Sequence, residues 1–244
     1  MIKIRIITLG HMPINLNKIK IENWKSKLFK LQGKIENYAL QDHCNGDDWT
    51  YTDNDLANCI FIDETADFTI ALTNVPLENN YYARRIGNNI VAITFFQMNE
   101  VLKEENIPLE NLVLRCIYAY SLIYLRFDRN ISSLTEVLSR KFTHDEVRGC
   151  LFDMTGWKTE VIYSCNKPIL CDSCIQKMKE QKVSTEKIKT VKTEIKRIKK
   201  DFFYELKDKF QKYPRSSFII LVISSTIISQ LTLFISKYIY HLFT

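Results

Sequence analysis

Glycine and proline are scarce in this sequence, with six and five residues among 244. Flexible linkers are rich in glycine and stiff ones in proline, so no long linker is evident. The sequence also lacks a glycine-rich phosphate loop, a Gly-x-Ser-x-Gly motif and a His-Glu-x-x-His motif. Only four histidines are present. These absences predict a chain without a catalytic site of a recognised kind.

The N-terminal residues lack the continuous apolar core of a secretory signal peptide. Apolar and basic residues alternate from Met1 to Arg5, which predicts a first β-strand. We therefore expect the globular part to be cytosolic. In a reducing compartment, the seven cysteines are better interpreted as metal ligands than as a disulfide framework.

A long apolar run near the C-terminus predicts one transmembrane helix. No charged residue occurs between Arg215 and Lys237. The charge-free stretch has about 21 residues, or about 31 Å of helix, against a hydrocarbon core of about 30 Å. The alternative is the buried core helix of a soluble domain. More basic residues precede the run than follow it, so the positive-inside rule places the N-terminal part in the cytoplasm and makes residues 215–244 a single-pass tail anchor.

Polar residues recur within the predicted span at helical spacing. Small hydroxyl side chains on one face allow helices to pack closely, and a glutamine in the membrane seeks a hydrogen-bonding partner. We therefore expect self-association through this helix and a homo-oligomer. The alternative is that the hydroxyls bond back to their own helix. The residues concerned are Ser225, Ser229, Gln230 and Thr232.

The segment before the span predicts a long basic helix from Ser184 to Lys212. Apolar residues from Ile188 to Phe202 follow heptad steps of three and four, which suits either a short coiled coil or packing on the globular part. Residues 177–215 contain fourteen Lys and Arg against six Asp and Glu. Such a basic excess beside a membrane helix points to anionic lipid, and to nucleic acid only indirectly. A merely solvated basic helix is the alternative.

Alternating elements in the N-terminal part predict an α/β fold with a mixed-sheet sandwich. The expected domains are an α/β domain (1–139), a zinc subdomain (140–180), the basic stalk helix (181–214) and the transmembrane anchor (215–244). Strands are expected at 4–9, 33–40, 67–73 and 89–95, and helices at 21–31, 53–59, 97–104 and 109–127.

A Cys-x-x-Cys turn, Cys171 to Cys174, presents two thiolates to one metal ion. Cys150 and His144 lie far enough away in the sequence to complete a tetrahedron from another element. Three thiolates and one imidazole form a closed structural zinc site. Cys165 competes with His144 as the fourth ligand, and buried free thiols or a redox pair are the alternatives to a metal. We expect Zn²⁺ to hold together a small subdomain that has little core of its own.

Two arginines suggest a contact surface. Arg84 and Arg85 follow two tyrosines in an expected loop after a strand. Arginine and aromatic side chains together suit recognition of a phosphate, a base or an acidic partner group. The sequence therefore predicts contact with a cytosolic protein partner or a small signal there, with a solvated loop as the alternative.

The order of these elements resembles the archaemetzincins, which are zinc-metallopeptidase-like proteins. The resemblance runs from Tyr51–Leu56 through the strands at 67–73 and 90–95 to the long helix and Cys171-x-x-Cys174, within residues 1–180. It implies a structural zinc bound by cysteines after the catalytic helix. The corresponding helix, Asn111–Leu122, has no histidine and no acid in the catalytic position. No catalytic residue is therefore carried over, and the resemblance implies a degenerate peptidase domain.

Three functions compete on these observations. A non-catalytic domain joined to an associating membrane helix resembles, in layout, the membrane effectors of bacterial antiphage defence, in which a cytosolic part senses a signal and the membrane part damages the bilayer. A tail-anchored adaptor that recruits a cytosolic partner is the second, and an active zinc metalloenzyme with an unrecognised site is the third. The effector predicts oligomers and toxicity through the span, whereas the adaptor predicts that any sufficiently apolar anchor would substitute.

Overall fold

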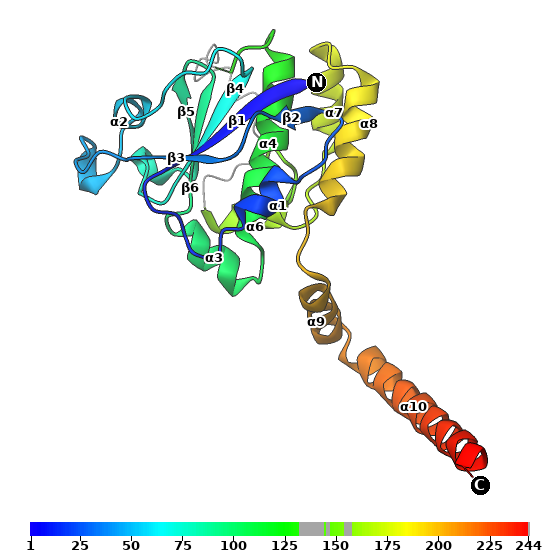
Figure 1. The fold of residues 1–244 in the computed structure, drawn as a ribbon. Helices are drawn as coiled ribbons and strands as arrows, with labels where there is room; N and C mark the ends of the chain where they lie inside the picture. Colours follow the sequence, from blue (N-terminus) through cyan, green and yellow to red (C-terminus); the bar gives the residue numbers. More distant parts are fainter. Residues whose placement is uncertain (132–143, 145–146, 154–157, 244) are drawn as a thin grey trace. The chain divides into compact units, whose positions relative to one another are not determined.

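The computed structural model describes residues 1–131, 144, 147–153 and 158–243. The chain forms two compact units, Met1–Lys200 and Asp201–Thr244. The first unit holds a sheet, the helices packed on it and the predicted metal ligands (Figure 1). The start of the predicted zinc subdomain, residues 140–143, lies outside the described residues.

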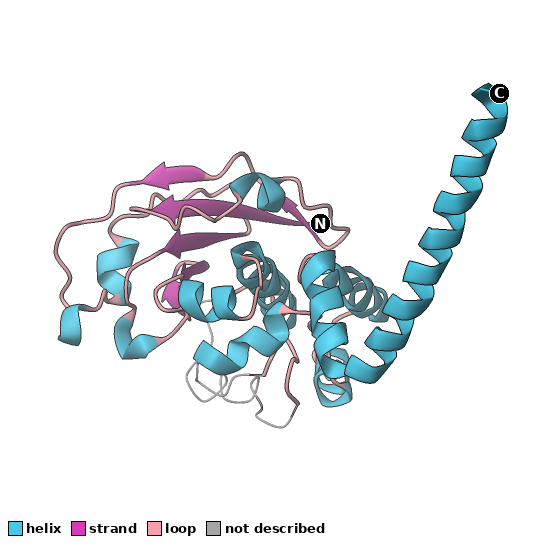
Figure 2. Ribbon diagram, turned by 90° about the horizontal axis from the view of Figure 1, so that it is seen from below, coloured by secondary structure: helices cyan, strands magenta, loops and turns pink. Residues whose placement is uncertain are grey.

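A six-stranded sheet forms one layer of the first unit (Figure 2). Its order is β2-β1-β4-β6-β5, and β3 pairs with the C-terminal part of β1 on the same edge as β2. The pairings are parallel except that of β5 with β6, so the sheet is mixed, as predicted. The strands are β1 (Ile2–Leu9), β2 (Phe29–Leu31), β3 (Glu36–Tyr38), β4 (Phe68–Thr73), β5 (Ala83–Gly87) and β6 (Ile90–Thr94).

The three central strands are buried on both faces, as the apolar runs of a parallel sheet require. β1 is buried at seven of its eight residues, and β4 and β6 along their whole lengths. One face of the sheet packs in the main core against α4 (Leu109–Arg126), which is itself buried over most of its length. The other face carries a smaller apolar cluster that includes Leu56 of α2 (Asp53–Ala57). The predicted α/β class is therefore confirmed.

The shorter helices connect the strands or cover the sheet (Figures 1 and 2). The predicted helices at 53–59, 97–104 and 109–127 all form, with ends that differ by at most two residues. Besides α2 and α4, the described residues of the first unit form the helices α1 (Lys18–Glu22), α3 (Met98–Glu104), α6 (Lys158–Cys165), α7 (Asp172–Glu180) and α8 (Thr185–Glu194), and the short 3-10 segments η1 (Asp47–Trp49), η2 (Glu78–Asn80) and η3 (Ile195–Arg197).

The predicted helix over residues 21–31 is wrong. α1 ends at Glu22, and the following segment leads into β2, which pairs in parallel with the start of β1. The Ser26 hydroxyl accepts hydrogen bonds from the backbone N–H groups of Leu28 and Phe29. Such local side-chain bonds offer the backbone an alternative to helix, which explains the break.

The predicted continuous stalk helix over residues 184–212 is also wrong. The segment divides into α8, η3 and α9 (Phe202–Lys212), with a non-helical connection before α9. The first unit extends to Lys200, so α8 belongs to it and the predicted boundary near residue 180 is not seen. The apolar seam packs on the globular part rather than in a coiled coil, because its residues are buried in the main core: Ile188, Val191, Ile195 and Ile198.

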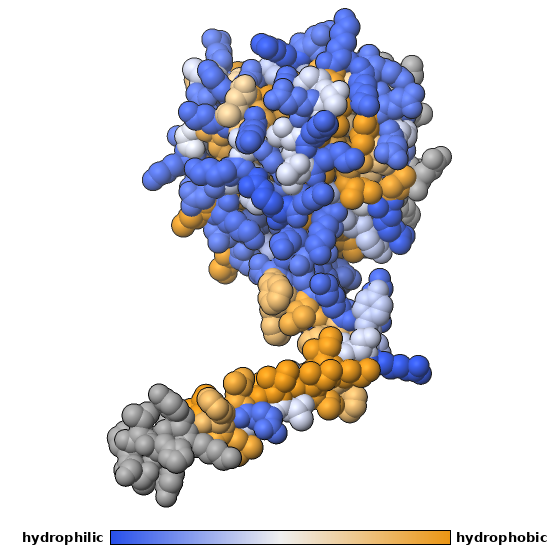
Figure 3. Space-filling model, turned by 90° about the vertical axis from the view of Figure 1, so that its right-hand side faces the viewer, coloured by the Kyte–Doolittle hydropathy of each residue, from blue (hydrophilic) through white to orange (hydrophobic). Residues whose placement is uncertain are grey.

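The second unit consists of α9 and α10 (Pro214–Phe243). Within α10, the stretch Pro214–Ser236 has 23 residues, and its most apolar 18-residue window has a mean hydropathy of 2.3, so the stretch is long and apolar enough to cross a membrane. None of its most apolar window is buried. In Figure 3 the described side chains of α10 form a mainly orange, apolar surface, whereas the visible surface of the first unit is mainly blue. This exposure argues against the alternative interpretation, in which the run is the buried core helix of a soluble domain.

Candidate metal centre

Two of the predicted ligands lie at the start of α7. Cys171 is the N-cap residue of this helix, and its Sγ accepts a hydrogen bond from the Cys174 backbone N–H at 3.4 Å. The first turn of a helix has free N–H groups that stabilise negative charge. A helix N-terminus therefore favours the thiolate, which is the form of cysteine that binds a metal.

Cys150 comes from a tight turn that precedes α6. Its backbone forms a parallel bridge with Ile169, and the adjacent Leu151 N–H donates to the Ile169 carbonyl at 2.9 Å. Gly149 has a φ of +88°, which side chains other than hydrogen rarely allow. A Cβ at Gly149 would also lie 3.3 Å from the Tyr163 carbonyl oxygen. The turn therefore requires glycine, and together with the bridge it fixes the position of Cys150.

His144 completes the cluster. Its Nε2 lies 3.1 Å from the Sγ of Cys174 and 3.3 Å from the Sγ of Cys171. The Sγ atoms of Cys150 and Cys174 are 3.8 Å apart, and all four ligand atoms lie within 4.8 Å of one another. A tetrahedral zinc ion, with bonds of about 2.3 Å to sulfur and about 2.0 Å to nitrogen, needs ligand separations of about 3.5–3.8 Å. The four side chains could therefore hold one metal ion.

The donor set indicates which ion fits. Three sulfur atoms and one imidazole suit zinc, whereas magnesium and calcium prefer oxygen ligands. The Nδ1 atom of His144 is buried without a hydrogen-bonding partner in the described part of the chain. A proton on Nδ1 leaves the Nε2 lone pair directed at the sulfur atoms, which is the tautomer that a metal ligand needs. The cluster therefore fits the predicted cofactor, Zn²⁺.

The close approach of the sulfur atoms changes their protonation. The hydrogen bond between the two thiols lowers the pKa of Cys150, and the same interaction raises the pKa of Cys174. A bound Zn²⁺ would favour the thiolate form of both, because its charge stabilises thiolates at neighbouring positions.

Cys165, the alternative fourth ligand, lies outside this cluster. Its side chain is fully buried, and burial raises its pKa to about 12. Its backbone carbonyl accepts a 2.9 Å hydrogen bond from the Asn111 side chain of α4. The structure therefore brings His144, and not Cys165, to the other three cysteines.

A buried arginine of α4 supports the turn that carries Cys150. Arg115 donates to the Leu151 carbonyl and to the Ser164 hydroxyl, each at 2.7 Å, and to the Tyr82 hydroxyl at 2.8 Å. Burial alone would lower the pKa of Arg115, but its interaction with Tyr82 and nearby thiols raises it above the ordinary value. The sequence reasoning missed this residue, although a charge in the middle of an apolar helix was a visible signal.

Arg126, at the end of α4, is a second buried arginine near the cluster. Its guanidinium lies 5.4 Å from the centre of the Phe152 ring, and its Nε donates to Gln181 after α7. Burial lowers the pKa of Arg126 to about 10, and the Cys174 thiolate acts in the opposite direction. Because three thiolates and one Zn²⁺ carry a net charge of −1, a buried cation within electrostatic range suits the loaded centre.

The predicted contact residues Arg84 and Arg85 lie in strand β5, so their placement in a loop is wrong. Arg84 donates to both carboxylate oxygens of Asp53, at 2.6 and 2.8 Å, and pairs with Glu78 at 2.9 Å. The hydrogen bond to Asp53 raises the pKa of Arg84. Arg84 therefore connects β5 with α2 and η2, while contact of either arginine with a partner or signal stays a prediction.

Three of the four residues predicted to associate in the membrane bond to their own helix. The hydroxyls of Ser225, Ser229 and Thr232 donate to backbone carbonyls three or four positions earlier, at 2.8–2.9 Å. This is the alternative arrangement that the sequence left open. Gln230 differs, because its side chain is exposed and makes no hydrogen bond to another described residue.

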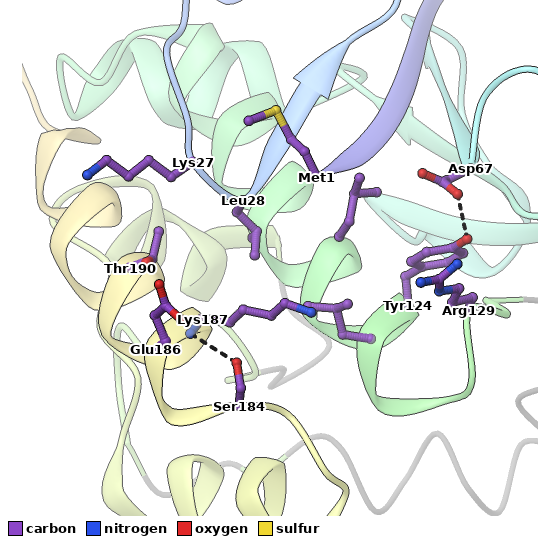
Figure 4. A pocket seen from close by; sticks show the side chains of 12 residues that line it. Met1, Lys27, Leu28, Asp67, Tyr124, Arg129, Ser184, Glu186, Lys187 and Thr190 are labelled. Carbon is purple, nitrogen blue, oxygen red and sulfur yellow. Dashed lines mark hydrogen bonds between the residues drawn. The ribbon is translucent and has the colours of Figure 1, made fainter.

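A cavity of about 310 Å³ lies between the start of β1, the end of α4 and the start of α8 (Figure 4). Asp67 in its wall accepts hydrogen bonds from the Tyr124 hydroxyl at 2.8 Å and the Lys3 N–H at 2.7 Å. Its charged lining is of mixed sign and includes Arg129 and Lys187. None of the predicted metal ligands lines it. The cavity is thus separate from the metal centre.

No family model matches the sequence, and no curated protein matches it. Among solved structures, the chain is similar to the archaemetzincin of Methanopyrus kandleri, with a TM-score of 0.42 and 15% sequence identity. The match covers 74% of this chain and 94% of that chain. The matched protein belongs to the family that the order of elements in the sequence resembles. At this sequence identity the likeness concerns the fold alone.

Proposed function

We propose that this chain is a non-catalytic, membrane-anchored adaptor, in which α10 spans a bilayer and the first unit binds a cytosolic partner. The observation that carries the proposal is the exposed apolar stretch Pro214–Ser236, which lies outside a compact unit that has its own core. A helix that is apolar on all sides needs a nonpolar environment. A bilayer provides it over the whole stretch.

The metal centre fits a structural role. Catalytic zinc sites keep one position open for water or substrate, whereas the four side chains of this cluster would fill all four positions. The three cysteines are buried in the main core, where an ion would stabilise the fold. Both points support a structural rather than a catalytic role for the ion.

The distribution of basic residues favours a cytoplasmic first unit. The positive-inside rule retains the more basic flank of a span in the cytoplasm. One basic residue, Lys237, follows the stretch within α10, whereas four lie just before it or at its start: Lys207, Lys209, Lys212 and Arg215. A partner in the cytosol follows from this orientation.

A membrane effector of the antiphage type, acting by self-association, is the second candidate. The observation that favours it is Gln230, because an amide within hydrocarbon gains by bonding to a neighbouring helix. The other grounds for association are weaker than the sequence indicated. The apolar seam of α8 packs in the main core, and the hydroxyls of α10 bond to their own backbone.

Replacement of the span separates the two candidates. The full chain would be expressed in bacteria with its native span or with residues 216–236 replaced by an unrelated leucine–alanine span. An adaptor attaches to membranes in a carbonate-resistant form in both versions. It leaves the membrane potential unchanged, even when an added N-terminal dimerising domain forces the chains together.

Depolarisation by the native span alone, abolished by Gln230→Leu, would instead establish the effector. The matched control is Ser224→Leu, which also removes a polar side chain from the span but leaves the amide in place. A full chain found only in the soluble fraction would contradict both candidates.

A further inference from the structure

The helix α9 has one apolar face. Phe202, Leu206 and Phe210 follow one another at intervals of four residues, and Phe203 and Tyr213 lie on the same side. At about 100° per residue, these five positions fall within an arc of about 100°. The sequence of α9 therefore separates apolar from polar residues around its circumference.

The aromatic residues at the two edges of this face are exposed, and Leu206 and Phe210 between them are half-buried. Phe202, Phe203 and Tyr213 are 74%, 69% and 55% exposed, and no residue of α9 is buried. Large aromatic side chains in a folded protein usually bury most of their surface, and contiguous exposed ones mark a contact with something else. The face is therefore available to a partner from outside the described chain.

The charges of α9 are ordered around this face. By the same helical spacing, Lys207 and Lys209 lie at the two edges of the apolar arc, while Glu205 and Asp208 lie toward the opposite side. Lysines at such edges cover apolar surface with their stems and keep their ammonium groups in the polar phase. Apolar residues bordered by lysines are typical of helices that lie in a membrane surface.

The link between α9 and α10 is too short to let α9 move far from the start of α10. α9 ends at Lys212, Tyr213 has non-helical dihedral angles (φ −128°, ψ 64°), and α10 begins at Pro214. A residue before proline is disfavoured in the helical conformation, so the chain breaks between the two helices. Since a single residue separates them, a membrane-spanning α10 holds α9 at the level of the lipid headgroups.

We infer that α9 is an interfacial helix that binds the surface of an anionic bilayer, with its aromatic face among the headgroups and its two edge lysines beside anionic lipids. The inference rests on the proposed function, because only a membrane-inserted α10 brings α9 to that surface. It also limits the anionic-lipid contact predicted for residues 177–215 to the lysines of α9. The lysines of α8 belong to the first unit, whereas those of α9 adjoin the span.

Lipid quenching of a site-specific probe in the full chain tests this inference. An environment-sensitive fluorophore attached to Phe203→Cys reports on the apolar face, and the same fluorophore on Gln211→Cys reports on the opposite side. Cys44 and Cys59, which are half-buried, are changed to serine in both versions to limit labelling to the new site. The protein is inserted into vesicles of phosphatidylcholine that contain a spin-labelled lipid, with or without phosphatidylserine.

We expect several-fold stronger quenching at position 203 than at 211, with a further increase in vesicles that contain phosphatidylserine. The double variant Lys207→Gln, Lys209→Gln should lose that increase, whereas Lys187→Gln, Lys189→Gln in α8 should keep it. Equal quenching at 203 and 211, in protein that resists carbonate extraction, would overturn the inference. An increase that persists without the edge lysines would overturn their assigned role. Loss of carbonate-resistant attachment of the unlabelled chain would instead overturn the proposed function.

Discussion

The Tyr118 hydroxyl of α4 donates a 2.7 Å hydrogen bond to the Glu194 carboxylate at the end of α8. The same carboxylate accepts hydrogen bonds from the Ser26 hydroxyl at 2.6 Å and the Lys27 N–H at 2.7 Å. Trp24 Nε1 in turn donates to the Tyr118 oxygen at 3.0 Å. Three segments far apart in the sequence therefore meet at one buried carboxylate, and this junction makes α8 part of the first unit.

Glu194→Ala should destabilise the first unit by about 3 kcal/mol, because the change leaves buried donors unsatisfied. Urea unfolding of the full chain in detergent, followed by circular dichroism, measures the effect. Glu186→Ala is the matched control, since this glutamate is exposed on the same helix, and it should change the free energy of unfolding by less than about 0.5 kcal/mol. Equal effects of the two changes would show that α8 is not held by this junction.

The metal centre predicts one zinc ion per chain. Cys171→Ser should release the ion and destabilise the first unit, because it removes one of the four ligands. Cys165→Ser should keep the full zinc content, because Cys165 lies outside the cluster. Elemental analysis of purified full chain after dialysis measures both. Zinc retained by Cys171→Ser, or lost from Cys165→Ser, would contradict the assigned ligand set.

The elements that could be predicted from the sequence are those with a strong local signal. The apolar runs of β1, β4 and β6 and the long helix α4 appear where expected. The Cys-x-x-Cys motif also predicted that the thiols of Cys171 and Cys174 lie together, because its spacing places both on one helical turn, and the structure has them in one cluster. In these places a few neighbouring residues determine the structure.

The parts that were missed depend on distant residues. The segment before β2 has a helical pattern, yet the Ser26 hydroxyl and the pairing with β1 make residues 29–31 a strand. The heptad pattern of α8 was real, but heptad spacing does not reveal whether the apolar seam faces another chain or its own core. The burial of the seam in the main core, together with the three donors from other elements that meet Glu194, decides between them.

The two arginines of β5 should respond differently to substitution. Arg84→Gln breaks the two-pronged contact with Asp53 and the ion pair with Glu78, and should reduce the free energy of unfolding by about 1–2 kcal/mol. Arg85 makes no such ion pair or hydrogen bond with its side chain among the described residues, so Arg85→Gln should change the free energy of unfolding by less than about 0.5 kcal/mol. Chemical unfolding of both variants measures the difference. A larger effect at Arg85 would mean that it, rather than Arg84, holds the edge strand.

The last prediction concerns acid stability and the buried carboxylate of Asp55 in α2. Burial opposes its ionisation, but hydrogen bonds from the backbone N–H groups of Asn45 and Thr52, at 3.0 and 2.9 Å, outweigh this and lower the pKa to about 2. The ordinary value is 3.8. Because the folded state binds the proton less tightly than the unfolded state, this contribution to stability is complete above about pH 4 and is lost as the pH falls toward 2.

The corresponding loss of stability is about 2 kcal/mol, since each unit of pKa is worth about 1.4 kcal/mol. Asp55→Asn should lower the free energy of unfolding at pH 7 and flatten its decline between pH 4 and 2. Asp48→Asn, which changes an exposed residue of η1, should keep the decline of the unmodified chain. Protonation of the zinc ligands also destabilises the protein in acid, but it affects both variants alike. The difference between their pH profiles therefore isolates Asp55, and identical profiles would show that its hydrogen bonds do not stabilise the folded state.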